Sequence, residues 1–288
     1  MLDFIYWNAD PVLISLGPFQ VRWYGLAFAI GFFIGYKIVE AMFKHEGAPE
    51  KWLGILLAYV IVGTIVGARL GHVFFYQWDY YSQHPGEIFK IWEGGLASHG
   101  GTIALIIAVF LFSWIVTKKP ASWTFDKLVI PIALVGGLIR LGNLMNSEIY
   151  GGETTLPWGF IFLREGETLP KHPTQIYEAL CYFVLFAILM WMYWKKNAEE
   201  RPWLITGVFF IGIFLPRFLI EYVKNVQVAK EVDMIATYGI NMGQLLSIPF
   251  IILGIILVVV ALVRPRQHWE FPNQFAEDLK GERNSAKK

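Results

Sequence analysis

The sequence predicts an all-α integral membrane protein, with about seven transmembrane helices and a small external head between the fourth and fifth of them. The first observation is composition, since 56% of the 288 residues are hydrophobic and only 16% are charged, against roughly a quarter in soluble domains. The second is that apolar residues gather in seven runs, each able to cross about 30 Å of hydrocarbon as a helix of about 20 residues. The third is that lysine and arginine gather in alternate connections between the runs.

The seven apolar runs are each predicted to form one transmembrane helix. They are continuous and lack the alternation of apolar and polar residues that is typical of a half-buried strand. A helix also satisfies its backbone hydrogen bonds within the segment, as the interior of a bilayer requires. The predicted spans are 21–43, 53–76, 97–117, 125–146, 174–194, 203–223 and 242–263.

Orientation follows from the lysine and arginine residues in the connections, because these residues accumulate on the cytoplasmic side. The connections after the first, third and fifth spans, together with the C-terminal tail, contain most of them: Lys44, Lys51, Lys118, Lys119, Lys127, Lys195, Lys196, Arg201, Arg264, Arg266, Lys280, Arg283, Lys287 and Lys288. We therefore expect the N-terminus outside the cell and the C-terminus in the cytoplasm.

The chain is expected to have two parts. Residues 1–266 form the transmembrane domain, and they include an external head at 147–173, a connection that is too long for a turn and rich in Gly, Pro and Trp. Residues 267–288 are predicted to form a polar cytoplasmic tail. On the second span, glycines recur every four residues at 63, 67 and 71, which predicts close approach of a neighbouring helix.

Composition also argues against several functional classes. The formal net charge of +1 gives no reason to expect nucleic acid as a partner. Cys181 is the single cysteine and lies in the apolar fifth span, where a thiol is expected to be inert. No cluster with the spacing of metal ligands occurs in the sequence, so neither a metal nor a cofactor is expected.

Ionisable residues in or next to the spans are the candidates for function. On insertion scales each charged side chain costs about 2.5–3.5 kcal/mol at the bilayer centre, so such residues usually face a partner or a polar cavity. The candidates are Arg69, His99, Arg140, Glu148, Glu178, Arg217 and Glu221.

The outer end of the fourth span contains a polar group of residues. Arg140 and Asn143 are three residues apart and share one helical face, and Asn146 and Glu148 follow where the helix leaves the membrane. The planar guanidinium suits a phosphodiester, and the amides could hold ester or glycerol oxygens. The structural alternative is a polar contact between helices.

The sixth span contains a second arginine. Arg217 and Glu221 are four residues apart, so they share a face and could neutralise each other. Pro216 is expected to bend the helix at this level. The pair is either purely structural or holds Arg217 ready for an anionic head group.

Three further residues have both a functional and a structural interpretation. His99 is followed by two glycines at the start of the third span, and it could accept a proton near neutral pH or simply lie at the interface. His172 precedes the fifth span and either orients the head or takes part in chemistry. Tyr24 could donate a hydrogen bond to a lipid or anchor the interface.

Six motifs occur in the order that they have in prolipoprotein diacylglyceryl transferases, and the chain resembles that family from about Trp23 to Pro249. The motifs are RWYG, SHGG, RLGNLMNSE, HPTQIYE, PRFLIEY and NMGQLLSIP, of which RLGNLMNSE is the most specific. The resemblance implies a multi-pass protein of the bacterial plasma (inner) membrane, with seven spans and an external head. It also implies transfer of a diacylglyceryl group from phosphatidylglycerol to the lipobox cysteine that follows a preprolipoprotein signal peptide, with release of glycerol phosphate.

The resemblance also implies roles for individual residues. Arg140 and Arg217 would be essential for binding the lipid head group. Further positions that match family residues linked to activity or binding are Tyr24, His99, Asn143, Asn146, Glu148, Gly151 and Glu221. The sequence departs from the family pattern at Ile139, Leu144, Ser147 and Ile213, where the family usually has Gly, Phe, Gly and, in some members, Tyr.

These residues fit the chemistry of such a transfer. A thiol with a pKa of about 8.5 is only a few per cent ionised at pH 7, so a base is useful. His99 is the first candidate for that base, and Glu148 or Glu221 is the second. The thiolate would attack the glycerol carbon that bears the phosphodiester, and the two arginines would stabilise the departing phosphate.

Two other classes of membrane protein would also place arginines in a membrane cavity. One is a transporter of an anionic solute, and the other is a different phospholipid-using transferase. The asparagine and glutamate residues beside the arginines and the order of the motifs favour the diacylglyceryl transferase.

Overall fold

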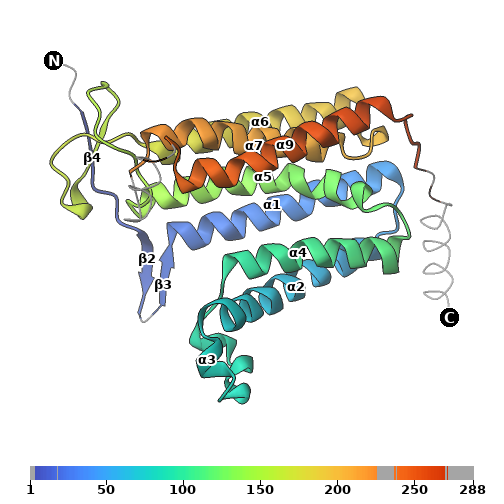
Figure 1. Ribbon diagram of the computed structural model, residues 1–288, viewed down its shortest axis with the longest axis horizontal. Helices are drawn as coiled ribbons and strands as arrows, with labels where there is room; N and C mark the ends of the chain where they lie inside the picture. The colour runs from blue at the N-terminus through green and yellow to red at the C-terminus, as the bar shows by residue number, and fades with distance from the viewer. Residues whose placement is uncertain (1–3, 18, 226–236, 238, 270, 272–288) are drawn as a thin grey trace. The chain divides into compact units, whose positions relative to one another are not determined.

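The structure of this protein is a computed structural model that describes residues 4–17, 19–225, 237, 239–269 and 271. Among these residues, seven helices are long and apolar enough to cross a membrane (Figure 1), which confirms the predicted fold class. They are α1 (Trp23–Glu46), α2 (Lys51–Tyr76), α4 (Ser98–Phe112), α5 (Ala121–Met145), α6 (Thr174–Lys196), α7 (Leu204–Ile220) and α9 (Met242–Val263). Their bounds lie within a few residues of the predicted spans.

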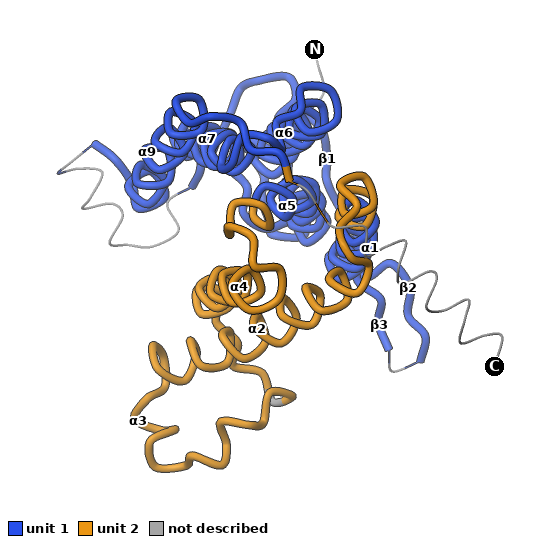
Figure 2. The backbone as a smooth tube through the Cα atoms, turned by 90° about the vertical axis from the view of Figure 1, so that its right-hand side faces the viewer, with its two compact units in different colours: residues 1–38, 126–268 blue, residues 39–125, 269–288 orange. Residues whose placement is uncertain are grey.

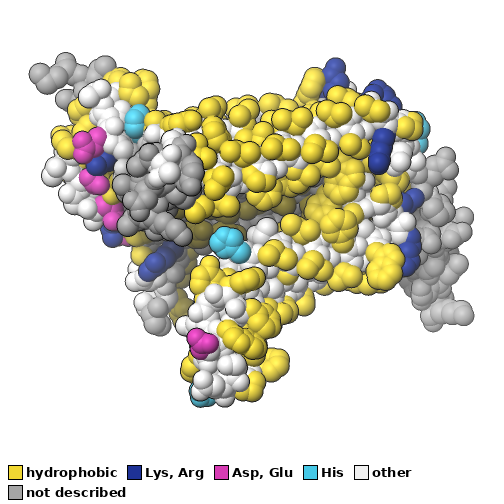
Figure 3. All heavy atoms as spheres, in the orientation of Figure 1, with side chains coloured by type: hydrophobic (Ala, Val, Ile, Leu, Met, Phe, Trp, Pro, Cys, Tyr) yellow, Lys and Arg dark blue, Asp and Glu magenta, His cyan; other side chains and the backbone are white. Residues whose placement is uncertain are grey.

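The seven helices keep much of their apolar surface on the outside. At most 44% of the residues in the most apolar stretch of any of them are buried within the molecule. Figure 3 shows the cover of hydrophobic side chains that results. In water, so large an apolar surface would cause aggregation, whereas lipid chains match it. The protein is therefore an all-α integral membrane protein.

The chain divides into two compact units, which Figure 2 shows in different colours. The first unit comprises residues 1–38 and 126–268, and within it α7 packs against both α6 and α9. The second unit comprises residues 39–125 and 269–288, and its two long helices, α2 and α4, pack along each other.

Small residues allow the close packing of α2 and α4 in the second unit. A Cβ atom added to Gly67 would lie 2.6 Å from the carbonyl oxygen of Gly100, and one added to Gly71 would lie 2.6 Å from the Cα of the same residue. At Gly63 the added atom would lie 2.9 Å from the Cβ of Ala108. The predicted helix contact through every fourth residue of α2 is confirmed.

Arg69 has a structural role in the second unit, although its place in a span made it a functional candidate. Its guanidinium donates hydrogen bonds to the carbonyl oxygens of Glu87 (2.7 Å), Ile88 (2.8 Å) and Gly94 (2.7 Å), and it lies over the ring of Tyr81 at 5.0 Å. These contacts organise the connection between α2 and α4, which contains the short helix α3 (Trp78–Tyr81) and the 3-10 turns η1 (Pro85–Phe89) and η2 (Ile91–Glu93). Backbone carbonyls thus satisfy the charge, which gives Arg69 a structural reason to lie in a span.

Asp126 fixes the beginning of α7 in the first unit. Its buried carboxylate accepts hydrogen bonds from the backbone N–H of Trp203 (2.7 Å) and from the backbone N–H (2.8 Å) and hydroxyl (2.6 Å) of Thr206. The first N–H groups of a helix lack partners within it, and here a residue of α5 supplies the acceptor. This cap comes from about 80 residues earlier in the chain, so no local pattern indicates it.

The N-terminal segment and the head contain short strands that hydropathy did not reveal. Strand β1 (Ile5–Trp7) pairs in parallel with β4 (Phe160–Phe162), while β2 (Val12–Leu16) and β3 (Phe19–Arg22) form an antiparallel hairpin that leads into α1. Trp7, Leu144 and Tyr150 pack with β4, and the indole of Trp7 donates to the Leu144 carbonyl oxygen at 3.0 Å. The N-terminal segment is thereby joined to the end of α5 and to the head.

The described part of the tail places an aromatic side chain in the second unit. The ring centroid of Phe271 lies 5.6 Å from that of Trp123, and the Lys119 ammonium lies 4.8 Å from the Phe271 centroid. The rest of the predicted polar tail, 272–288, lies outside the described residues.

Candidate active site

Glu178 is the centre of a group of charged side chains in the first unit. Its side chain is only 1% exposed. One carboxylate oxygen, Oε2, forms an ion pair with Nε of Arg140, and the other, Oε1, lies 2.6 Å from Nζ of Lys224. Nζ of Lys224 also lies 3.3 Å from Oε2 of Glu221. We call Arg140, Glu178, Glu221 and Lys224 the charge cluster.

A chain of hydrogen bonds leads from Arg140 to the end of α5. Nη1 of Arg140 donates to Oδ1 of Asn143 at 3.3 Å, and Nδ2 of Asn143 donates to Oε1 of Glu148 at 2.7 Å. Nδ2 of Asn146 donates to the same oxygen at 3.1 Å. The predicted shared face of Arg140 and Asn143 is confirmed, and the carboxylate of Glu148 is held by both asparagines.

The turn after α5 owes its shape to the beginning of α6. Ser147 and Ile149 have positive φ angles of 56° and 61°, an unusual backbone for residues other than glycine. Nε2 of Gln175 donates to the carbonyl oxygen of Glu148 at 2.7 Å. The hydroxyl of Thr174 donates to the carbonyl oxygen of Ile149 at 2.9 Å. Position 147 is where the family usually has glycine, and the positive φ angle explains that preference.

Gly151 brings the segment after α7 into the site. It forms an antiparallel bridge with Lys224. The N–H of Gly151 donates to the carbonyl oxygen of His172 at 2.8 Å, and the N–H of Gly152 donates to the carbonyl oxygen of Val223 at 2.8 Å. A Cβ atom on Gly151 would collide with the Val223 oxygen and lie 2.8 Å from the His172 Cβ. Gly151, singled out as a binding residue, thus positions Lys224 through its backbone.

The expected ion pair between Arg217 and Glu221 is absent from the described residues. α7 ends at Ile220 and the 3-10 turn η6 (Glu221–Val223) follows, but the backbone of Glu221 is still right-handed helical and its N–H donates to the Arg217 carbonyl oxygen. The helix therefore continues through the four-residue spacing, and the choice of partner decides the contact. Glu221 pairs with Lys224 instead. Its carboxylate lies against Gly243 at the start of α9, where an added Cβ atom would come within 2.5 Å of Oε1.

Arg217 has no carboxylate partner among the described residues. It interacts electrostatically with Tyr182, which also interacts with Arg140 and Glu178. Arg217 therefore borders the charge cluster without being neutralised in it. An arginine in such a setting is costly in a membrane unless an anion joins it.

Tyr24 lies in the first turn of α1, beside α5. A Cβ atom added to Gly142 would lie 2.9 Å from Cδ2 of Tyr24 and 3.2 Å from its Cα. The Tyr24 ring therefore covers α5 between Arg140 and Asn143, and no described residue forms a hydrogen bond with its hydroxyl.

The two candidate histidines belong to different parts of the protein. His99 is exposed at the start of α4 and belongs to the second unit. His172 belongs to the head, where its Nδ1 lies 3.2 Å from the hydroxyl of Tyr177. Burial lowers the pKa of His172 below its ordinary value of about 6.5, which favours the neutral ring.

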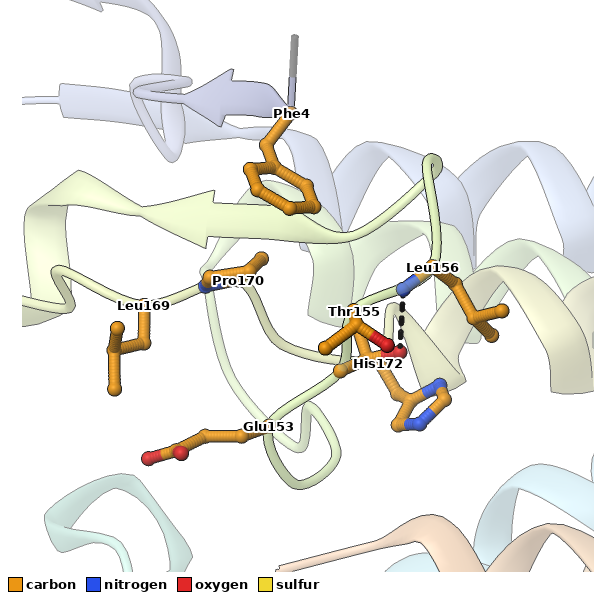
Figure 4. A pocket seen from close by; sticks show the side chains of 8 residues that line it. Phe4, Glu153, Thr155, Leu156, Leu169, Pro170 and His172 are labelled. Carbon is orange, nitrogen blue, oxygen red and sulfur yellow. Dashed lines mark hydrogen bonds between the residues drawn. The ribbon is translucent and has the colours of Figure 1, made fainter. Parts of the chain in front are cut away.

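His172 also lines a cavity of about 610 Å³ in the head, which Figure 4 shows from close by. The other lining residues are Phe4, Glu153, Thr154, Thr155, Leu156, Leu169 and Pro170. The ring of His172 thus faces the head, and its backbone carbonyl contacts Gly151. Elsewhere in the described chain, no group of three or more His, Cys, Asp or Glu side chains could hold a metal ion.

Sequence reasoning assigned no role to Lys224, and none to Glu178 beyond its place in a span. Lys224 follows the predicted sixth span directly, in a connection on the expected outer side. Its contacts depend on the bridge with Gly151, about 70 residues away, which no local spacing indicates. A buried lysine three residues after a glutamate was the single available signal.

The family model of prolipoprotein diacylglyceryl transferases matches residues 11–260. Phosphatidylglycerol–prolipoprotein diacylglyceryl transferase of Porphyromonas gingivalis is 54% identical over 272 residues, which cover 91% of this chain and 96% of that protein. The proteins of the same name from Tolumonas auensis and Chloroherpeton thalassium are 46% and 44% identical, over 89% of this chain and 97% and 94% of theirs. The chain belongs to the prolipoprotein diacylglyceryl transferase family.

Proposed function

We propose that this protein is an enzyme that transfers the diacylglyceryl group of phosphatidylglycerol to the lipobox cysteine of a preprolipoprotein, the first step of bacterial lipoprotein maturation. The observation that carries the proposal is the charge cluster with Arg217 beside it, in a chain of this family. The cluster offers cations to a phosphodiester at one end of membrane-spanning helices. No observation favours the transporter or another phospholipid-using transferase.

The reaction exchanges a carbon–oxygen bond for a carbon–sulfur bond. The thiolate of the acceptor attacks the glycerol carbon that bears the phosphate, and the electron pair of the breaking bond passes to the phosphate oxygen. Glycerol phosphate leaves with one more negative charge than the phosphodiester had. Arg140 and Arg217 stabilise that charge as it develops, which is the step at which fixed donors have their largest effect.

The thiol proton must pass to a base, for which His99 remains the first candidate. The carboxylate of Glu148 already accepts hydrogen bonds from Asn143 and Asn146, and Glu221 is paired with Lys224. His99 is exposed, and no described residue forms a hydrogen bond with its imidazole ring. These differences support His99, with Glu148 and Glu221 as the alternatives.

Three residues near Arg140 are proposed to bind the neutral part of the lipid. The hydroxyl of Tyr24 has no partner in the described protein and lies beside the helix that carries Arg140 and Asn143. It is placed to donate to a glycerol or ester oxygen. The amides of Asn143 and Asn146, which are held at Glu148, are proposed to bind ester or glycerol oxygens. Gly151 and His172 are proposed to shape the adjoining backbone.

The protein is proposed to span the plasma membrane with its N-terminus and head outside and its C-terminus in the cytoplasm. On α6, Glu178 lies about 17 residues before Lys195, a rise of roughly 25 Å. The charge cluster is thus at the opposite end of the helix from Lys195 and Lys196, which mark the cytoplasmic side by the positive-inside rule. The phosphodiester would therefore come from the outer leaflet.

The direct test is incubation of the purified protein with phosphatidylglycerol and a lipobox peptide, followed by mass spectrometry of the peptide. The peptide should gain one diacylglyceryl group, and a peptide with serine in place of cysteine should gain none. Phosphatidylcholine, offered as the only lipid, should support little transfer if the head group is recognised. A diacylglyceryl transferase of known activity serves as the positive control. If that enzyme modifies the cysteine peptide and this protein does not, the proposed activity is refuted.

A further inference from the structure

Glu178 contacts cations from two different parts of the chain. Arg140 belongs to α5, and Lys224 follows the turn after α7, whereas Glu178 itself lies one turn into α6. All three side chains are largely buried, with 16%, 5% and 1% of their surfaces exposed, respectively. Charges withdrawn from water in this way are tolerated only when they are paired in good geometry. Glu178 is thus required for both cations to be present together.

The contacts of Glu178 set the direction of the Arg140 guanidinium. Nε is occupied by the ion pair with Glu178, and one Nη1 proton is directed to Asn143. Arg140 also forms a side-chain hydrogen bond with Tyr182. A guanidinium has five N–H donors in a rigid fork, so the donors that remain for a ligand are at its terminal edge. This edge is oriented before any lipid arrives, and such preorganisation is what makes donors effective in a transition state.

The formal charges of the charge cluster and Arg217 leave one cation in excess. Arg140, Arg217 and Lys224 are positive, while Glu178 and Glu221 are negative, which leaves a single positive charge among these five residues. A phosphodiester carries a single negative charge. Lys224 has three donors and contacts two carboxylates, so one donor remains for a ligand.

We propose that Glu178 is a positioning residue for diacylglyceryl transfer, which holds Arg140 and Lys224 in the arrangement that receives the departing phosphate. This inference rests on the proposed function. Glu178 does not touch the lipid but acts through the two cations. Lys224 becomes the third cation of the phosphate site, beside the two arginines.

The competing explanation is that Glu178 only braces α5, α6 and the segment after α7. A brace contributes to the stability of the fold and has no special effect on the chemical step. A positioning residue lowers turnover when it is lost, because donors aimed at the transition state lose their direction. The two explanations are therefore separated by kcat, by the KM for phosphatidylglycerol and by the melting temperature.

The experiment compares the full-length wild type with Glu178→Gln, Lys224→Met and the double variant, in one detergent with phosphatidylglycerol and the lipobox peptide. Glu178→Gln should lower kcat at least tenfold and change the KM for the lipid less than threefold. Lys224→Met should lose less, because Arg140 keeps its partner. The double variant has the net charge of the wild type. It should still be as slow as Glu178→Gln, because Arg140 lacks its ion pair with residue 178 in both.

Asp126→Asn is the matched control, since it also replaces a buried carboxylate of the first unit. Its contacts are to the beginning of α7, so it should lower the melting temperature and leave kcat unchanged. If Glu178→Gln does not fold, Glu178→Asp decides, because it keeps the charge but is too short to hold both cations. It should fold and lose kcat.

Three results would overturn the inference while the wild type stays active. They are a normal kcat in folded Glu178→Gln or Glu178→Asp, recovery of kcat in the double variant, and failure of both single Glu178 variants to fold. A normal kcat would show that Glu178 is dispensable for turnover. Recovery in the double variant would show that only the net charge matters, and failure to fold would show that Glu178 stabilises the packing of the helices. A wild type that modifies no peptide would instead refute the proposed function.

Discussion

At the scale of single residues, the two arginines of the phosphate site differ in their surroundings. Arg140 is held by Glu178 and Asn143, whereas Arg217 has no carboxylate partner among the described residues. Arg140 therefore supplies direction and Arg217 supplies unbalanced charge. Both functions depend on guanidinium, because its planar fork matches two oxygens of a phosphate, while an ammonium is a point charge.

Replacement of either arginine by lysine tests this requirement. Arg140→Lys and Arg217→Lys should both insert and fold but lose at least tenfold in activity, which corresponds to about 1.4 kcal/mol in the activation barrier. Initial rates with phosphatidylglycerol and the melting temperatures are to be measured together. Wild-type rates in both folded variants would show that charge alone is sufficient and that forked hydrogen bonds are not needed.

His99 is proposed to accept the proton of the substrate thiol, a role that its few contacts in the structure do not test. If it accepts the thiol proton, His99→Gln should lower kcat and leave the KM for the lipid nearly unchanged. Raising the pH should then restore part of the rate, because a larger fraction of the substrate thiol, with a pKa of about 8.5, ionises without help. The measurement is the ratio of variant to wild-type kcat from pH 6.5 to 9. A ratio that stays constant with pH would make His99 a supporting residue.

At the scale of elements, hydropathy was sufficient for the helices and insufficient for what lies between them. The spans were predictable because lipid demands about 20 apolar residues in each. β1 and β4 were not, since strands of three residues leave no periodic pattern. The pair expected between Arg217 and Glu221 was wrong because the Glu221 carboxylate pairs with Lys224, a residue just beyond the predicted span that hydropathy did not single out.

In the site, residues close together in the chain were predictable, whereas contacts between distant segments were not. Arg140, Asn143 and Glu148 were predictable as a group because they lie close together in the chain. Lys224 was not, since its place depends on a backbone bridge between the head and the segment after α7. Arg69 is a charge in a span whose carbonyl partners were equally unpredictable. Partners distant in sequence decided both cases.

The bridge through Gly151 gives a sharp test at this scale. In Gly151→Ala the new Cβ would collide with the Val223 oxygen, so the segment that carries Lys224 must move away. We expect a loss of at least tenfold in kcat and a lower melting temperature. Gly152→Ala is the matched control, because its Cβ would have only ordinary contacts, at 3.6 and 3.8 Å. Equal effects of the two substitutions would contradict the role of the bridge.

At the scale of the whole molecule, membrane orientation decides which leaflet supplies the lipid. α6 ends with Lys195 and Lys196, while the head and the charge cluster lie at its beginning. Positive residues accumulate on the cytoplasmic side of such helices. The active site should therefore open to the outer leaflet, where an exported peptide can reach it.

Single cysteines in a Cys181→Ser background test this orientation in intact cells. Thr155 in the head and Lys195 at the end of α6 are both exposed, so a cysteine at either position is accessible to a reagent on its own side. An impermeant maleimide added outside should label Thr155→Cys and leave Lys195→Cys unlabelled. After the cells are broken open, both should react, which shows that both thiols are reactive. Labelling of Lys195→Cys alone in intact cells would invert the topology and move the proposed site to the cytoplasmic leaflet, where a cysteine that follows an exported signal peptide could not reach it.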